Sequence, residues 1–143
     1  MLDIDLDILA SHTNDNPVYY VQYAHARTCN VAKNAAEHGV KREAGFDPSQ
    51  LSDPADAALI GVLAQYPSVV RSAADERAAH QVARYLESLA SAYHTGYGKR
   101  RVTPASDETL SAEHVALLHL NDAVGQVLRN GLELCGVEAP HRM

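Results

Sequence analysis

The residues best suited to binding a metal ion are eight histidines and two cysteines. His25 and Cys29 are four residues apart, a spacing that places two side chains on the same face of a helix. No third ligand accompanies this pair in the sequence. His114 and His119 are five residues apart and point in different directions on a helix, so they form no second pair. We therefore predict no metal site.

The sequence gives as little support to catalysis. The chain contains neither a glycine-rich loop that binds phosphate nor a Gly-x-Ser-x-Gly turn that presents a nucleophilic serine. Its carboxylates are scattered and fit helix starts or exposed faces, and no nucleophile has a base beside it. We expect no catalytic residue, and the residues alone favour a binding module over an enzyme.

A row of aromatic and polar residues is the best candidate for a binding surface. Five residues share one face of the first predicted helix because they recur at three- and four-residue spacing: Tyr20, Tyr23, Arg27, Asn30 and Asn34. A helix face exposed only to water more often carries Glu and Lys. Two interpretations stay open. The row is either a tyrosine-rich packing face with a polar rim, or a face that binds a ligand or docks onto another part of the protein.

Composition limits the classes of protein to consider. The chain has 143 residues, 46% of them hydrophobic, which is enough for one packed core. Its formal charge of -6 argues against a broadly basic nucleic-acid binder. A local basic face is compatible with this charge, because counterion release depends only on the cations that touch phosphate. Two cysteines are too few for a disulfide framework, and no stretch resembles a signal peptide or a membrane span, so we expect a cytoplasmic protein without membrane contact.

Proline, glycine and capping residues divide the chain into helices. The segment from Asn14 to Pro17 predicts a helix start, and Gly39 predicts a helix end. The pattern predicts helices over residues 17–38, 54–65, from 67 onward, 78–97 and 111–135. Residues 2–8 alternate apolar and acidic side chains, the period of a short extended segment. The predicted fold class is all-α, a bundle of about five helices with a short extended segment at the N-terminus.

Apolar residues at helical spacing mark the faces expected in the core. On the first helix they are Val18, Val21, Ala24, Thr28, Val31 and Ala35. On the helix predicted over residues 78–97 they are Val82, Leu86, Leu89 and Tyr93. On the last helix a wide apolar surface, which includes Leu134, indicates burial between neighbouring helices. Gly125 and Gly131 lie inside that helix, where each costs roughly 1 kcal/mol relative to alanine. We predict that these two glycines allow a close helix crossing.

Three longer segments and one short one resemble a single known family. Asn16 to Arg27 has the sequence NPVYYVQYAHAR, and the chain ends NGLELCGVEAPHRM. His80 to Val102 is similar to the pattern H-x-x-x-x-Y-L-x-x-L-A-x-x-F-H-x-F-Y-x-x-x-R-V, and residues 2–8 to L-D-F-D-L-D-L. All four resemble the C-terminal DALR anticodon-binding domain of bacterial-type arginyl-tRNA synthetases, in order and at similar spacing. The resemblance covers nearly the whole chain.

The resemblance implies an architecture and a function. Residues 1–143 would be a single anticodon-binding domain, of which residues 1–13 link to a catalytic domain outside this chain. The whole enzyme would use ATP and Mg²⁺ to attach arginine to tRNA(Arg), while this domain binds the anticodon stem and loop. The class I signatures H-I-G-H and K-M-S-K-S do not occur here, so this part is expected to have no cofactor and no catalytic activity of its own.

The resemblance also implies partners. We expect the chain to be a monomer that binds tRNA(Arg) and contacts the catalytic domain of the same enzyme. In the alternative, the chain is a helical docking domain that packs on the catalytic core and binds little RNA by itself. In that case Tyr23 and Arg27 would contact the catalytic domain instead of RNA.

The motif positions assign candidate RNA contacts in the helices. Unpaired anticodon bases are recognised by stacking on aromatic or guanidinium planes. Tyr97 matches the tyrosine of F-H-x-F-Y, so the resemblance implies that it stacks on a base, and its glycine neighbours favour exposure. Tyr23 and Arg27 match residues of Q-Y-A-H-A-R and contact either RNA or the catalytic domain. His25 is expected to be an interface or core histidine rather than an RNA ligand.

The basic residues near the helix end and the C-terminus are the remaining candidates. Lys99, Arg100 and Arg101 could contact phosphates, although cations are also favoured at a helix C-terminus by about 0.3–1 kcal/mol each. Arg101 ranks first because it matches the arginine of the R-V pair. Arg142 and Met143 match the terminal R-M pair, which in the family lies against the anticodon loop. His141 stands where the family usually has glutamate.

Overall fold

The computed structural model describes residues 16–97 and 101–143. In this part of the chain there are five α-helices and two short 3-10 helices, and no strand. Their bounds are α2 (Pro17–Glu37), η1 (Arg42–Ala44), η2 (Pro48–Gln50), α3 (Pro54–Ala64), α4 (Tyr66–Asp75), α5 (His80–Tyr97) and α6 (Ala112–Leu134). The all-α prediction is confirmed. The predicted extended segment at residues 2–8 and the cations Lys99 and Arg100 lie outside the described residues.

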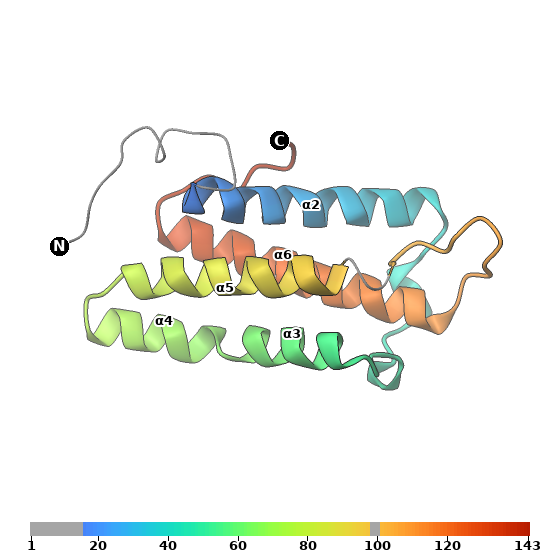
Figure 1. Ribbon diagram of the computed structural model, residues 1–143, viewed down its shortest axis with the longest axis horizontal. Coiled ribbons are helices and arrows are strands. Elements are labelled where there is room, and N and C mark those ends of the chain that lie inside the picture. The colour runs from blue at the N-terminus through green and yellow to red at the C-terminus, as the bar shows by residue number, and fades with distance from the viewer. Residues whose placement is uncertain (1–15, 98–100) are drawn as a thin grey trace.

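The helices form a bundle of four rods (Figure 1). The long helices α2, α5 and α6 pack against one another, and α3 and α4 together make a fourth, broken rod along α5. α2 and α5 run in one direction, while α3–α4 and α6 run in the other. The break falls at Gln65, which ends α3 and precedes α4. Pro67 comes two residues later, in the first turn of α4, and a proline ring is tolerated in the first turn of a helix but not in its interior.

Capping side chains start two helices where the sequence predicts. The Asn16 side chain accepts a hydrogen bond from the amide of Val18 at 3.1 Å, and Pro17 occupies the first position of α2. The Asp53 side chain accepts in the same way from the amide of Ala55 at 2.8 Å. At the other end of α2 the chain turns at Gly39, whose φ of 79° lies in the left-handed region. The predicted first helix is therefore correct to within a residue at each end.

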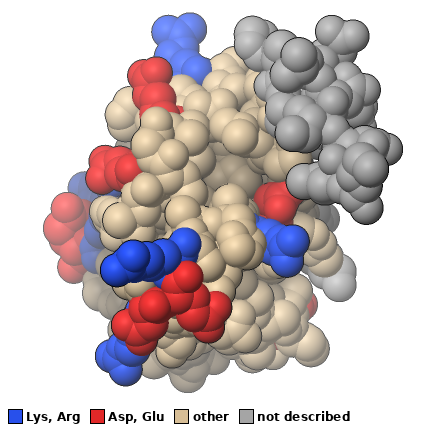
Figure 2. Space-filling view, turned by 90° about the vertical axis from the view of Figure 1, so that its left-hand side faces the viewer, with Lys and Arg blue, Asp and Glu red and all other residues tan. Residues whose placement is uncertain are grey.

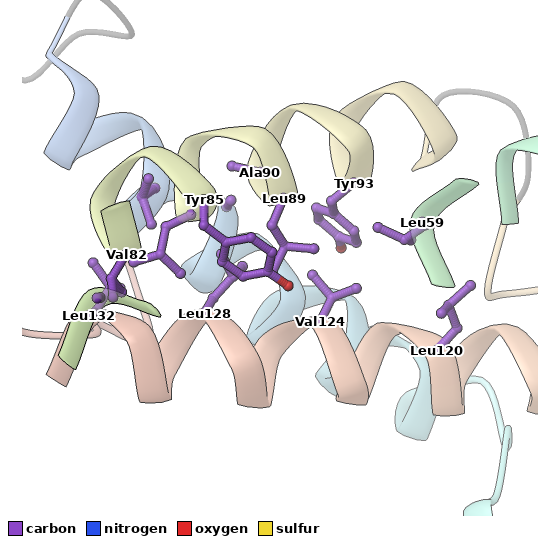
Figure 3. Packing of buried hydrophobic residues seen from close by; sticks show 14 residues of the cluster. Leu59, Val82, Tyr85, Leu89, Ala90, Tyr93, Leu120, Val124, Leu128 and Leu132 are labelled. Atoms are coloured by element: carbon purple, nitrogen blue, oxygen red, sulfur yellow. The ribbon is translucent and has the colours of Figure 1, made fainter. Parts of the chain in front are cut away.

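The core lies between α5 and α6 and is closed by α3 (Figure 3). From α5 the buried side chains include Leu89 and Tyr93, and from α6 they include Val124 and Leu128. Leu59 of α3 packs against them from the side. The predicted apolar face of α5, with Val82, Leu86, Leu89 and Tyr93, is confirmed because all four are buried.

At the helix ends, two residues predicted in apolar faces are exposed. Val18 is 42% exposed because it lies in the first turn of α2, where it lines an open hollow with Ala83 and Val137. Leu134 is 57% exposed, since two residues along a helix place it about 200° around the axis from buried Leu132. The spacing rule fails at such helix ends because neighbouring helices no longer surround the side chain.

The two glycines in α6 mark close crossings, as predicted. A Cβ atom at Gly125 would lie 2.7 Å from the Oγ1 atom of Thr28 in α2. A Cβ atom at Gly131 would collide with the side chain of Leu86 in α5. Only a residue without a side chain fits between the helices at these two points. α6 is thereby held against both α2 and α5.

A buried polar residue connects the same three helices. The Asn121 side chain of α6 donates to the carbonyl oxygen of Thr28 in α2 at 3.0 Å. It accepts a hydrogen bond of 2.7 Å from the Tyr93 hydroxyl of α5. Burial raises the pKa of Tyr93, so this hydroxyl remains a donor. The network fixes the C-terminal half of α5 relative to the middle of α2.

Charge on one end of the bundle is mixed. Figure 2 shows Lys and Arg side chains beside Asp and Glu on that face, with no large patch of one sign. In the described part of the chain, every helix is too short or too polar to cross a bilayer.

Candidate nucleic-acid interface

A hollow of about 460 Å³ opens between the middle of α2, the end of α5 and the C-terminal tail. We call it the α2–tail hollow. Its lining residues are Tyr23, Ala26, Arg27, Asn30, Tyr97, His141, Arg142 and Met143. Five of the six residues predicted to contact RNA are among them, although they come from three separate segments of the chain. The sixth, Arg101, is exposed and does not line the hollow.

An arginine–tyrosine stack forms one wall of the α2–tail hollow. The guanidinium carbon of Arg27 lies 3.9 Å from the centre of the Tyr97 ring. This distance is within the range of a cation–π interaction. Tyr97 is 36% exposed, as its glycine neighbours indicated, but one of its ring faces is covered by the guanidinium. The expected bare tyrosine platform is thus a two-layer stack.

His94 holds the same guanidinium from a second direction. Its Nδ1 atom lies 2.9 Å from the Nη1 atom of Arg27. The His94 ring packs among three tyrosine rings, with centroid distances of 5.4 Å to Tyr20, 5.8 Å to Tyr23 and 5.7 Å to Tyr93. Burial, and then the charge of Arg27, lower the pKa of His94. The sequence contained a signal for this residue, because it lies three positions before Tyr97 on the same helix face.

The row of aromatic and polar residues on α2 serves in part as a packing face and in part as a face open to a ligand, the two interpretations that the sequence left open. Tyr20 is half-buried and packs against His94, so it belongs to a packing face. Tyr23, Arg27 and Asn30 line the α2–tail hollow and are available to a ligand. Asn34, one turn further on, is exposed and does not line the hollow.

Two residues of α2 fasten the C-terminal tail. The side-chain amide of Gln22 donates to the carbonyl oxygen of Glu138 at 2.9 Å. The Nδ1 atom of His25 lies 2.8 Å from the carbonyl oxygen of Pro140. A carbonyl oxygen only accepts, so Nδ1 carries the proton. His25 is fully buried, and burial lowers its pKa. It is the core histidine that we expected, and it places Arg142 and Met143 beside the hollow.

The tail makes a further contact at Cys29. The Sγ atom of Cys29 lies 3.5 Å from the Nδ1 atom of His141 and 3.9 Å from the Nε2 atom of His25. His141 is the neighbour that sequence spacing could not supply, because 112 positions separate it from Cys29. No three His, Cys, Asp or Glu residues in the described ranges are arranged to hold a metal ion.

The charge of the α2–tail hollow is opposite in sign to that of the chain. Arg27 and Arg142 line it, while no aspartate or glutamate among the described residues does. The chain as a whole carries a formal charge of -6. A local cationic surface of this kind is what binding to a nucleic acid requires, whatever the net charge.

An all-α bundle that exposes tyrosines and arginines around one hollow has the features of a domain that binds unpaired bases. Comparison with known families matches residues 21–143 to the DALR anticodon binding domain, and the chain belongs to that family.

Similar proteins are considerably longer than this chain. It is 54% identical to an arginine–tRNA ligase of Kineococcus radiotolerans and 55% identical to one of Clavibacter sepedonicus, over 142 residues in both cases. These matches cover 99% of the chain but 26% of each relative. The chain therefore spans about a quarter of the length of the curated relatives it matches.

Solved structures agree with this fold. A crystal structure from Campylobacter jejuni, assigned as an arginyl-tRNA synthetase, matches with a TM-score of 0.79 at 26% identity. That match covers 99% of this chain and 30% of the other. The arginyl-tRNA synthetase of Thermus thermophilus matches with a TM-score of 0.73 at 30% identity, over 94% of this chain and 22% of that one. The resemblance found in the sequence is confirmed at the level of fold and family.

Proposed function

We propose that this chain is the anticodon-binding domain of an arginine–tRNA ligase and that it binds the anticodon stem-loop of tRNA(Arg). A class I catalytic domain outside this chain would attach arginine to the tRNA, using ATP and Mg²⁺. Residues 1–143 are then one domain, with residues 1–13 leading to the catalytic domain, in a monomeric cytoplasmic enzyme. The observation that carries the proposal is the α2–tail hollow, which gathers five motif residues from three distant segments.

Base stacking explains the types of residue around the hollow. The Arg27 guanidinium already lies on the Tyr97 ring, so a base that lies on its outer face extends the stack by one layer. Tyr23 exposes 38% of its surface and offers a second ring. Stacking of this kind is worth roughly 1–3 kcal/mol per base, and it adds to the contacts that cations make with the phosphates.

The remaining candidate residues fit contacts with the phosphates and with the edges of the bases. Arg142 lines the hollow. Arg101 is exposed and lies four residues after the end of α5 in the sequence, so both arginines can contact the RNA backbone. Met143 and the side-chain amide of Asn30 lie at the same hollow and limit the shape of what enters. Phosphate contacts position the RNA, while discrimination comes from stacking and from contacts with base edges.

The alternative, a docking domain with little RNA binding of its own, is not favoured by the match to an anticodon-binding family. A docking domain would use Tyr20 to pack on the catalytic domain. Here Tyr20 already packs on His94 within the chain. Tyr23, Arg27 and Tyr97 keep exposed surface that this packing does not use.

Binding of the folded chain to arginine tRNA tests the proposal. It is compared with the same tRNA carrying a changed anticodon, at two salt concentrations. We expect salt-sensitive binding that the anticodon change weakens by about tenfold or more, the scale of one lost base contact. Equal affinity for both tRNAs would contradict anticodon recognition. Light scattering on the same sample checks whether the chain is a monomer, as we propose.

A further inference from the structure

An unpaired buried nitrogen lies behind the α2–tail hollow. In the described part of the chain, the Nε2 atom of His94 is the one buried side-chain nitrogen or oxygen without a hydrogen-bond partner. Buried polar groups are almost always paired, because leaving one unpaired destabilises the folded state. A phenylalanine would fill the same place among three tyrosine rings without this penalty. Packing alone therefore does not explain why the residue is histidine.

The other ring nitrogen supplies the explanation. A guanidinium has five N–H donors and no acceptor, so the Nδ1 atom of His94 must accept the 2.9 Å hydrogen bond from Arg27. A neutral imidazole has one acceptor and one N–H, and the proton is then on Nε2. The tautomer that binds Arg27 is thus the one that leaves the buried Nε2–H unpaired.

One helix face supplies both contacts to Arg27. His94 and Tyr97 are three residues apart on α5, so their side chains lie on neighbouring turns of one face. The guanidinium carbon lies over the ring of Tyr97, while His94 accepts a hydrogen bond from Nη1 of the same group. A long arginine side chain that is held by two such contacts has little freedom left to rotate.

We propose that His94 is a positioning residue, an uncharged acceptor that holds the Arg27 guanidinium against Tyr97 so that an anticodon base can stack on it. The RNA part of this statement rests on the proposed function, whereas the positioning of Arg27 does not. His94 itself touches the arginine and not the RNA.

Acid should release the arginine. Among the described residues, the groups that face His94 are Tyr20, Tyr23 and Arg27 from α2 and Tyr93 from its own helix. Phenol groups are uncharged in weakly acidic solution, so within the described part of the chain the one charge facing the imidazole is the guanidinium. Protonation at Nδ1 would remove the acceptor and set two cations side by side. Because the pKa of His94 is lowered, the neutral form persists at neutral pH, and release occurs below its ordinary pKa of 6.5.

Side-chain NMR of Arg27 tests the positioning without RNA. In the wild-type chain the ring current of Tyr97 should shift the Arg27 resonances upfield. We expect His94→Phe to fold as well as wild type and to lose most of this shift. His94→Asn, whose side-chain oxygen stands near the place of Nδ1, should keep it. An unchanged shift in His94→Phe would overturn the proposal.

Binding to the arginine anticodon stem-loop tests the consequence. His94→Phe should weaken binding by about tenfold, the scale of one hydrogen bond to a charged group, and His94→Asn should recover most of it. Arg27→Ala should bind at least as weakly as His94→Phe, and adding His94→Phe to Arg27→Ala should weaken binding no further. His80→Asn, at the exposed start of α5, serves as the matched control and should bind as wild type.

The outcomes separate the two proposals. If His94→Phe binds as wild type while Arg27→Ala is impaired, the positioning by His94 is wrong and the proposed function stands. If the anticodon change has no effect on any variant, the proposed function fails, and the NMR shift still decides the positioning. Wild-type affinity should also fall between pH 7 and about pH 5.5 more steeply than that of His94→Asn. His141 lines the hollow in both proteins, so its contribution to binding is common to both.

Discussion

Two regions of the molecule are built from different kinds of contact. One is the core between α5 and α6, and the other is the wall of the α2–tail hollow. In the core, apolar side chains from helices of regular spacing bury one another, and glycines let the helices approach. At the hollow, single polar contacts join residues far apart in the chain, such as Gln22 with Glu138 and His25 with Pro140. The core should therefore determine stability, and the polar contacts should determine where the binding residues lie.

The largest expected effect breaks the core. Leu128 is fully buried, so Leu128→Ala removes apolar contacts and leaves a cavity. We expect a loss of about 3 kcal/mol in the free energy of unfolding, which lowers the melting temperature by roughly 10 °C. Calorimetry measures this change. The RNA affinity of the fraction that remains folded should stay within about twofold of wild type, and a large loss of affinity would show that the two regions are coupled.

The next largest effect concerns His25, which is buried and also holds the tail beside the hollow. His25→Ala removes the hydrogen bond to Pro140 and the buried ring, so we expect a loss of about 1–3 kcal/mol together with several-fold weaker RNA binding. Gln22→Ala is the matched comparison, because its bond to Glu138 is exposed, and it should cost less than about 1 kcal/mol. Equal RNA affinity in His25→Ala and wild type would contradict an anchored tail.

Buried His25 and half-buried His94 also predict a pH dependence of stability. The pKa of His25 and of His94 is lowered in the folded chain, so the unfolded chain binds more protons below their ordinary value of 6.5. Stability therefore rises with pH in this range: it is fully present above 6.5 and is lost as the pH falls toward the lower folded values. Denaturant unfolding at pH 7.5 and pH 5.5 measures the loss. His25→Phe should flatten the profile if it folds, and a profile as steep as that of wild type would contradict the assignment to His25.

How much the sequence could predict follows the same division. Helical spacing found the buried face of α5 and the glycine crossings, because these depend on neighbours along one helix. It failed for Val18, which lies in the first turn of α2, where neighbouring helices do not surround the side chain. Motif matching found five residues of the hollow but not the contact from His94 to Arg27. Spacing along the chain does not report such a pairing, since 67 positions separate the two residues.

A smaller effect tests charge at the hollow. Arg142→Ala should weaken RNA binding and reduce the slope of log affinity against log salt concentration by about one. The free energy of unfolding should stay within about 0.5 kcal/mol of wild type. Arg71→Ala, an exposed arginine on α4, should change neither affinity nor slope. Arg101→Ala measures how far the RNA extends beyond the hollow. If Arg71→Ala lowers the slope as much as Arg142→Ala, binding depends on overall charge and not on this surface.

The smallest effect concerns the sulfur contact of the tail. Cys29→Ser replaces a half-buried thiol that meets His141, and the hydroxyl can make the same kind of contact at shorter range. We expect a change in the free energy of unfolding of less than about 1 kcal/mol and RNA affinity within about twofold of wild type. A loss comparable to that of His25→Ala would mean that Cys29, and not the histidine, holds the tail.

The central claim is that the α2–tail hollow is the surface that receives the anticodon. Titration of the isotopically labelled chain with the arginine anticodon stem-loop, followed by side-chain NMR, tests it most directly. We predict that the largest shifts fall on Tyr23, Arg27, Tyr97 and the Met143 methyl group, while α3 and α4 stay unchanged. Shifts concentrated on α3 and α4, with the hollow silent, would contradict the account.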